Sequence, residues 1–197
     1  MWLVTLAPRV AVVIPCRNDA GYLDACLAAL AAQTHRPDVV IVVDNASTDA
    51  SAAVAHAYDA VLAYEPSIGI WPAVSRGYDA ALEHADIIAR LDADSRPHPD
   101  WIARLVRAFV ADPTLGVLTG GAEFYGGTPI QNYLGERWYI GGGHYWIKKW
   151  LGIPLVFGSN FAMRTRVWER VRDQVDRGNA RIHDDLDLTI RLRSSDG

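Results

Sequence analysis

The first half of the chain alternates between short apolar runs and longer stretches with helical periodicity. Each apolar run is continuous and is followed by polar residues. A continuous apolar run of this length predicts a buried strand. These predicted strands cover 10–14, 39–43, 60–64 and 86–91, and the predicted helices between them cover 22–32, 50–58 and 71–84. Strands and helices that alternate with short connections are typical of a mostly parallel central sheet with helices on both faces.

The second half has a different pattern. Its predicted elements are a helix over 101–110, a strand over 116–119, a strand and turn over 156–164, and helices over 166–175 and from His183 onward. Glycine and aromatic residues dominate 120–145, and such a segment cannot form a regular helix. No internal repeat or clear linker is present, so we expect a single α/β domain over 1–197 with two halves, 1–119 and 120–197.

Two acids stand where the last strand of the first half ends, in the segment Arg90-Leu91-Asp92-Ala93-Asp94-Ser95. In a strand, residues two apart leave the same face, so Asp92 and Asp94 point together. Carboxylate oxygens are the ligands that hard divalent cations prefer, which predicts a metal site. The alternative is a turn or a helix N-cap, because Asp and Ser favour these positions too.

Polar clusters also follow two other predicted strands, at 17–19 and 44–49. The carboxyl ends of parallel strands meet at one edge of the sheet, and ligands bind outside that edge. The sequence therefore predicts a ligand site formed by these clusters and the Asp92/Asp94 pair.

The composition excludes several classes of protein. Half of the 197 residues are hydrophobic and 21% are charged, which excludes a disordered chain. The formal charge of −4 argues against a nucleic-acid-binding protein. Cys16 and Cys26 are too few for a disulfide framework, which indicates a reducing compartment, and we expect a cytoplasmic protein.

No apolar run is long enough to span a membrane, and the first nine residues do not form a convincing signal peptide. The tryptophan-rich segment 145–158 contains two lysines. It is compatible with peripheral contact at the inner face of a membrane and with a core or substrate-facing role.

Five segments resemble, in order, the motifs of family 2 glycosyltransferases, which use nucleotide sugars and have the GT-A fold. They are Val12-Val13-Ile14-Pro15 with Arg17-Asn18, Val43 to Asp49, Leu91 to Asp94, Gly158 to Arg164, and Asp184-Asp185-Leu186-Asp187-Leu188 with Arg191-Leu192. Each segment alone is a weak signal, but together they cover nearly the whole chain. The resemblance implies a GT-A (Rossmann-like) domain in which 1–119 binds the nucleotide sugar and 120–197 contacts the acceptor.

The resemblance also implies roles for residues of the first half. Asp44 corresponds to the acid that recognises the base or ribose, and Pro15 and Arg17 to other parts of that donor pocket. Asp94 corresponds to the principal ligand of Mn²⁺ or Mg²⁺, and Asp92 lies against the ribose or supports the ion. For Asp44, the capping of a turn is the alternative.

In the second half, the resemblance implies that Asp185 is the catalytic base of a single inverting displacement. Gly158, Ser159, Asn160 and Asp184 correspond to the acceptor side. A divalent cation stabilises the charge that grows on a diphosphate leaving group, and a carboxylate takes the proton of the acceptor hydroxyl.

Two further residues have open interpretations. Arg90 is assigned to the donor site, with a structural ion pair as the alternative. His183 is a candidate additional metal ligand, although a lone histidine more often is not one.

The expected function is transfer of a sugar from a UDP-, GDP- or dTDP-linked donor to a hydroxyl of a glycan, a lipid or a small molecule. Many relatives carry asparagines where this chain has Ser67 and Ser75, so the donor contacts at these positions are not assigned. The Gln-x-x-Arg-Trp motif of processive synthases should follow the last acidic motif, but the sequence ends at Gly197 without it, which disfavours a processive polymerase. From this ending we expect an acceptor half that is either compact or truncated. The alternatives are a nucleotide-sugar-binding module without transfer activity and a nucleotidyltransferase, which would normally show a glycine-rich phosphate loop.

Overall fold

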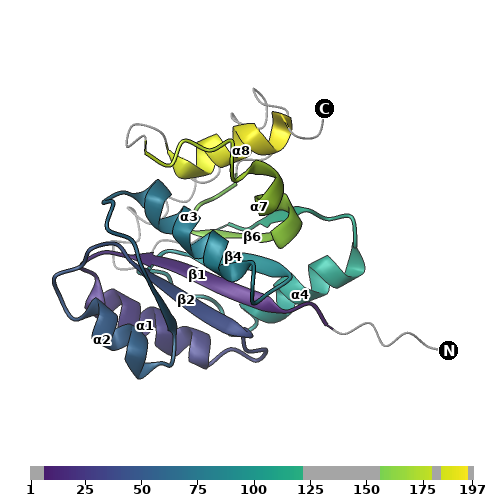
Figure 1. Ribbon diagram of the computed structural model, residues 1–197. Coiled ribbons are helices and arrows are strands. Elements are labelled where there is room, and N and C mark those ends of the chain that lie inside the picture. The colour runs from purple at the N-terminus through teal and green to yellow at the C-terminus, as the bar shows by residue number, and fades with distance from the viewer. Residues whose placement is uncertain (1–6, 122–155, 179–182, 195–197) are drawn as a thin grey trace, which may run out of the picture.

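The computed structural model describes residues 7–121, 156–178 and 183–194. These residues form a six-stranded sheet with the order β3-β2-β1-β4-β6-β5 (Figure 1). The strands are β1 (Val10–Cys16), β2 (Val39–Asp44), β3 (Val61–Tyr64), β4 (Ile87–Leu91), β5 (Val117–Thr119) and β6 (Asn160–Arg164). The first four are mutually parallel, whereas β6 runs antiparallel to β4 and to β5. The predicted mostly parallel α/β architecture is confirmed.

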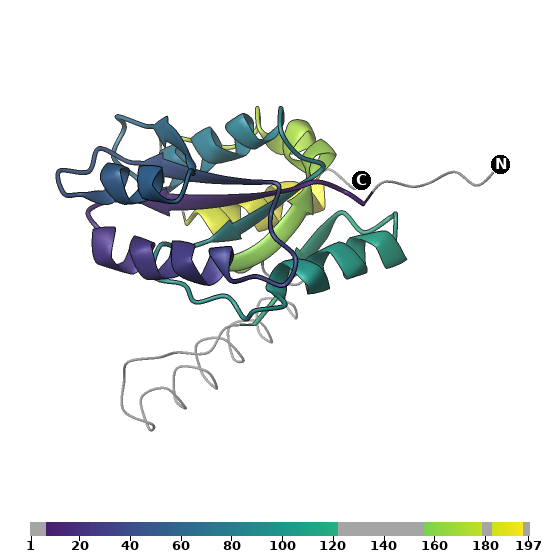
Figure 2. The same ribbon diagram turned by 90° about the horizontal axis from the view of Figure 1, so that it is seen from below.

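Helices cover both faces of the sheet, as predicted. They are α1 (Ala20–Ala31), α2 (Ser51–Ala57), α3 (Ile70–Ala81), α4 (Trp101–Ala111), α7 (Thr165–Val171) and α8 (Asp184–Ser194). Alternate residues of β1 enter two separate cores: Val10, Val12 and Ile14 pack with α1, α2 and α4, and Ala11 and Val13 pack with α3, α7 and α8. Figure 2 shows α1 in purple and α4 in teal on the same side of the sheet.

The first strand is longer than the sequence indicates. The predicted range ends at Ile14, directly before a proline, but β1 continues through Pro15 to Cys16, and Pro15 pairs with Val43 of β2. A proline in a central strand would remove a ladder hydrogen bond. Here β4 pairs only with Val10–Val13, so at Pro15 one side of β1 has no partner strand. Proline is therefore tolerated at this position.

Helix α3 lies unusually close to the sheet. A Cβ atom placed on Gly77 would be 2.3 Å from Cγ1 of Val13 and 2.8 Å from Cγ2 of Val43. Only glycine permits this approach, which fixes the height of α3 above β1 and β2.

Several sequence predictions fall outside the described residues. They include most of the glycine- and aromatic-rich segment and nearly all of the candidate membrane-surface segment 145–158. In the described ranges, every helix is too short or too polar to traverse a lipid bilayer.

Candidate functional site

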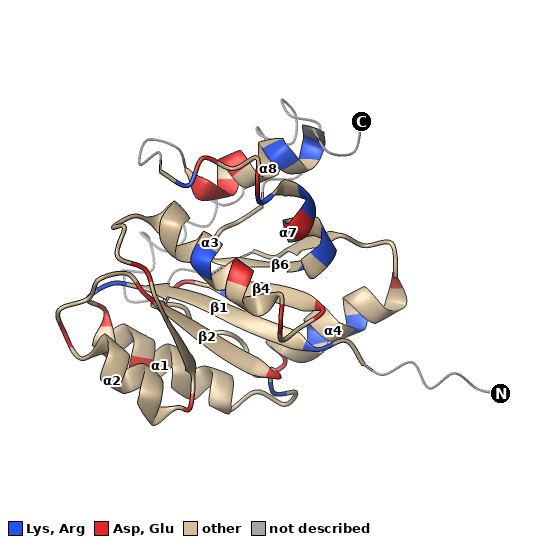
Figure 3. Cartoon of the chain, in the orientation of Figure 1, with Lys and Arg blue, Asp and Glu red and all other residues tan. Residues whose placement is uncertain are grey.

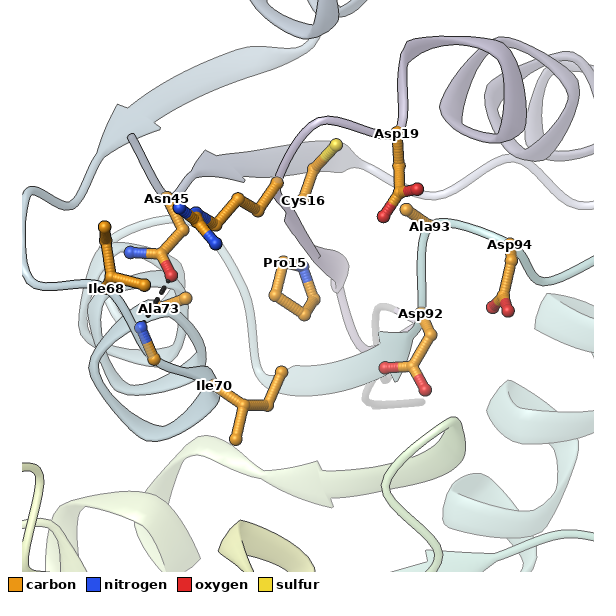
Figure 4. Close-up of a pocket in the computed structure, with 12 residues that line it drawn as sticks. Pro15, Cys16, Asp19, Asn45, Ile68, Ile70, Ala73, Asp92, Ala93 and Asp94 are labelled. Atoms are coloured by element: carbon orange, nitrogen blue, oxygen red, sulfur yellow. Dashed lines mark hydrogen bonds between the residues drawn. The ribbon is translucent and has the colours of Figure 1, made fainter. Parts of the chain in front are cut away.

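A cavity of about 370 Å³ opens at the carboxyl ends of β1 and β4 (Figure 4). Its lining residues come from the ends of three strands and from the start of α3: Pro15, Cys16, Arg17, Asp19, Asn45, Ile68, Gly69, Ile70, Ala73, Asp92, Ala93 and Asp94. Four of the predicted site residues therefore line the same cavity, namely Pro15, Arg17, Asp92 and Asp94.

The topology explains why the cavity lies there. The chain goes from β1 outward to β2 and β3, and then returns to place β4 on the other side of β1. Pairing between the two central strands ends at Val13 and Arg90, so the residues that follow diverge. A crevice forms at such a point of reversal, and in open α/β sheets it is the usual place for a ligand.

The two acids of the Asp-x-Asp segment line this cavity from the end of β4. Figure 4 shows both side chains on the segment that follows β4, with both carboxylates below Ala93 in this view. Burial, and then the charge of Asp92, raise the pKa of Asp94 above the ordinary range of an aspartate. Two carboxylates in this arrangement repel each other, and a divalent cation relieves that repulsion. The donor set therefore fits Mn²⁺ or Mg²⁺.

Asp92 and Asp94 by themselves would not complete the coordination of a metal ion. Throughout the described residues, no group of three or more His, Cys, Asp or Glu side chains lies close enough to enclose a metal ion. Mg²⁺ is usually bound by one or two carboxylates together with water and substrate phosphates, so two protein carboxylates are compatible with such an ion.

Arg90 lies behind the cavity wall, not in it. Its side chain is 3% exposed and forms ion pairs with two acids. Nη2 donates a hydrogen bond to Oδ1 of Asp92 at 3.1 Å, and Nη1 donates one to Oδ2 of Asp184, the first residue of α8. Arg90 therefore reaches the cavity through Asp92.

The loops that follow β1 and β2 are joined by side-chain hydrogen bonds. The Asn18 amide donates to Oγ of Ser47 at 3.2 Å, and the Thr48 amide donates to Oδ1 of Asn18 at 2.7 Å. Asp49 accepts a further bond from the Ala20 amide at the start of α1. Arg17 is consequently held on a loop that is fixed at both of its ends.

Asn45 holds the loop that precedes α3, and the sequence analysis did not assign a role to this residue. Its Nδ2 donates to the carbonyls of Glu65 and Ser67, and its Oδ1 accepts from the amide of Gly69. These bonds fix the loop that presents Ile68 to the cavity. The available signal was the position of Asn45 directly after Asp44 in a turn-rich segment.

Asp44 is buried at the end of β2, directly before the cavity-lining Asn45, and is not itself among the lining residues. Its Oδ1 accepts a hydrogen bond from the Ser47 amide at 2.9 Å, which is the turn-capping geometry that we gave as the alternative. Its assignment to the donor pocket stays a prediction.

The residues predicted for the acceptor side lie around β6 and the start of α8. A Cβ atom on Gly158 would be 3.2 Å from Nη1 of Arg90, so this position admits no larger side chain without displacing the guanidinium. Asn160 accepts from Nε1 of Trp101 and donates to the Gly121 carbonyl, and Ser159 lies in the turn before β6.

Asp185 and His183 lie at the beginning of α8. The first turn of this helix contains three acids and the last turn contains basic residues, as Figure 3 shows, which matches the helix dipole. Burial, and then the charge of Asp184, raise the pKa of Asp185. A carboxylate with a raised pKa is suited to general-base chemistry near neutral pH. The His183 side chain is exposed, and its role as a metal ligand stays a prediction.

The chain is similar to curated glycosyltransferases. It is 31% identical over 142 residues to the glycosyltransferase AglE of Haloferax volcanii, a match that covers 66% of this chain and 46% of AglE. It is 24% identical over 201 residues to the probable glycosyltransferase YdaM of Bacillus subtilis, covering 94% of this chain and 46% of YdaM. The chain thus spans about half the length of these relatives.

Solved structures show the same fold. Glucosyl-3-phosphoglycerate synthase of Mycobacterium tuberculosis, solved with Mn²⁺, UDP and glucosyl-3-phosphoglycerate, matches with a TM-score of 0.59 and 19% identity over 83% of this chain and 59% of its own. The mannosyltransferase PcManGT of Pyrobaculum calidifontis, solved with GDP-mannose and Mn²⁺, matches with a TM-score of 0.59 and 24% identity over 85% of this chain and 47% of its own. These neighbours are GT-A glycosyltransferases, which confirms the predicted fold.

Residues 11–172 match the sequence model of a protein family, glycosyl transferase family 2. This range includes the ends of β1, β2 and β4 and all of β6. This matched range contains every residue that lines the cavity. Together with the fold and the relatives, it shows that the chain belongs to glycosyl transferase family 2.

Proposed function

We propose that this chain binds a nucleoside diphosphate sugar in the cavity between β1 and β4 and transfers the sugar to an acceptor hydroxyl by an inverting displacement. The observation that carries the proposal is that Asp92 and Asp94 line the same cavity as Pro15 and Arg17. A diphosphate bound in this cavity would meet both acidic metal ligands and a cationic side chain.

Asp94, with Asp92, would hold a divalent cation, Mn²⁺ or Mg²⁺. The ion would supply positive charge to a departing diphosphate. The raised pKa of Asp94 supports this assignment, because a carboxylate that is buried beside another carboxylate gains most from a neighbouring cation. The Mn²⁺ in the two solved neighbours supports it independently.

The nucleoside would lie at the ends of β1 and β2. Pro15 and Arg17 line this part of the cavity, and Ile68 and Ile70 add apolar surface from the loop before α3. Asp44, the last residue of β2, is proposed to recognise the base or ribose. The cavity suits UDP, GDP or dTDP, and the two neighbours bind UDP and GDP-mannose respectively.

Asp185 is proposed as the base that removes the proton of the acceptor hydroxyl. Its side chain is partly buried at the start of α8, and its raised pKa favours proton transfer near neutral pH. Gly158, Ser159, Asn160 and Asp184 would shape the acceptor side, where a glycan, a lipid or a small molecule would present the hydroxyl.

The test is calorimetric titration of UDP, GDP and dTDP, each with and without Mn²⁺. We expect one nucleotide to bind wild type only when Mn²⁺ is present and to bind Asp94→Ala at least about tenfold more weakly. Asp173→Ala removes an exposed acid of the segment after α7 and serves as the matched control, with unchanged affinity expected. Equal binding by Asp94→Ala and wild type would refute the metal role, and no binding of any nucleotide to wild type would refute the donor site.

A further inference from the structure

Arg90 is the point at which the two halves of the site meet. It lies on β4, where its neighbours across the sheet are Val13 of β1 and Phe161 of β6. Its guanidinium is buried and contacts Asp92, which lines the cavity, and Asp184, which begins α8. The two acids are 92 residues apart in the chain, and this one cation holds both.

We propose that Arg90 is a positioning residue that fixes α8, and therefore Asp185, relative to the cavity through Asp184 and Asp92. This inference rests on the proposed donor site. It goes beyond it because it assigns to Asp184 an effect on nucleotide binding, although Asp184 does not line the cavity.

The geometry of arginine explains why this residue type occupies the position. The planar guanidinium offers several donors in fixed directions, so two carboxylates that contact different Nη atoms acquire a fixed separation. The contacts leave little freedom, since the Arg90 side chain is 3% exposed and the Asp184 side chain 9%. Gly158 completes the enclosure, because even a Cβ atom there would press on the guanidinium.

Loss of one anionic partner of Arg90 is expected to be costly. For a buried cation this loss costs far more free energy than for an exposed cation, because water cannot replace the lost interaction. If Asp184 loses its charge, Asp92 is the carboxylate that remains of the two ion pairs of Arg90, and it is drawn toward the guanidinium and away from a ligand. The state of α8 is thereby transmitted to the cavity.

Other contacts of α8 lack this connection. Asp187 accepts a hydrogen bond from Nε1 of Trp71 and pairs with Arg191, so it fastens the helix to α3 without touching Arg90 or Asp92. Asp187→Asn is therefore a matched control: it alters another buried acid of the same helix and leaves the Arg90 bridge in place.

The experiment is a double-mutant cycle on nucleotide affinity. Binding of UDP, GDP and dTDP with Mn²⁺ is measured by calorimetry for wild type, Asp184→Asn, Arg90→Met and the double variant. We expect Asp184→Asn to weaken binding about tenfold, within the usual range for coupling between sites. In the Arg90→Met background the same substitution should change affinity less than twofold, and Asp187→Asn should leave affinity within twofold of wild type.

Two further variants keep the test decisive if Asp184→Asn or Arg90→Met does not fold, which circular dichroism reports. Asp184→Glu keeps the charge but lengthens the side chain, and we expect several-fold weaker binding. Arg90→Lys keeps the charge but cannot hold both carboxylates in one geometry, so it should bind the nucleotide more weakly than wild type. Wild-type affinity of Arg90→Lys would show that charge alone suffices and would overturn the positioning role.

The remaining outcomes separate the inference from the proposed function. If wild type binds a nucleotide and Asp184→Asn binds it equally well, or if the two substitutions are additive, the positioning role is wrong and the donor site stands. If Asp187→Asn weakens binding as much as Asp184→Asn, the effect belongs to α8 docking in general and the role of Arg90 is again wrong. If wild type binds none of the nucleotides, the proposed function fails, and the inference fails with it.

Discussion

Replacement of Gly77 by alanine tests how closely α3 must approach the sheet. The added methyl group would lie 2.3 Å from Cγ1 of Val13 and 2.8 Å from Cγ2 of Val43, and both valines are fully buried. Both contacts are far inside van der Waals distance, and neither partner can turn away, because valine has few rotamers and close-packed neighbours. Helix α3 must therefore move outward.

The magnitude follows from two opposing effects. Overpacking of a well-filled core costs about 3 kcal/mol when the clash is this severe. Alanine in a helix is favoured over glycine by about 1 kcal/mol. The net loss of unfolding free energy is about 2 kcal/mol, which corresponds to a melting temperature lower by about 4–8 °C for a chain of this length.

Gly21→Ala is the matched control. Gly21 is also helical, but a Cβ atom there would meet nothing within 4 Å. The same chemical change should therefore stabilise the protein by up to about 1 kcal/mol. Urea unfolding followed by circular dichroism measures both variants. Wild-type or higher stability of Gly77→Ala would refute the argument that the approach of α3 requires glycine.

Three other substitutions or reactions give predictions that the structure makes directly. Asn45→Ala removes the hydrogen bonds that hold the loop before α3. It should lower the affinity for the bound nucleotide at least about fivefold, measured by calorimetry, and the unfolding free energy by about 2 kcal/mol, measured by urea unfolding of the same preparation. Unchanged values would show that the loop keeps its conformation without these bonds. Burial raises the pKa of Cys26 to about 12, so the thiol stays protonated up to high pH, and its alkylation by iodoacetamide at pH 9 should be at least about 100-fold slower in the native protein than in urea. Peptide mass spectrometry follows this site, and equal rates would contradict the burial. Trp71→Phe leaves the buried Oδ2 of Asp187 without its indole donor and should cost about 1–3 kcal/mol of unfolding free energy, measured in urea; a loss below 0.5 kcal/mol, taken as roughly the scatter of surface substitutions, would show that the bond adds nothing.

The order of elements was predictable because it depends on local chemistry. Continuous apolar runs identify strands that are buried on both faces, and this pattern located β1, β2 and β4 within one or two residues at each end. The prediction of the first strand was wrong at its end, because β1 includes Pro15 and Cys16. That error arose because the tolerance for proline depends on which neighbouring strand is present, and this is a property of the sheet.

The candidate site also contains residues that the sequence predicted and a residue that it did not. The sequence indicated that Asp92 and Asp94 end a strand, and the structure places both in a cavity wall. It gave no reason to single out Asn45 as a support for the loop before α3, because that role consists of three bonds to segments about twenty residues away. A hydrogen-bond partner at such a separation leaves no periodic trace in the sequence.

The sequence by itself determined the strands and helices, their order and the position of the acidic segment, because each depends on residues that are close together in the chain. Only the tertiary structure decided that β6 inserts antiparallel beside β4, that α8 docks on α3 through Trp71, and that Arg90 meets Asp184 across 94 residues. These contacts depend on which buried surfaces and charges can be satisfied together. That condition is met by the packing of the whole sheet and not by any segment alone.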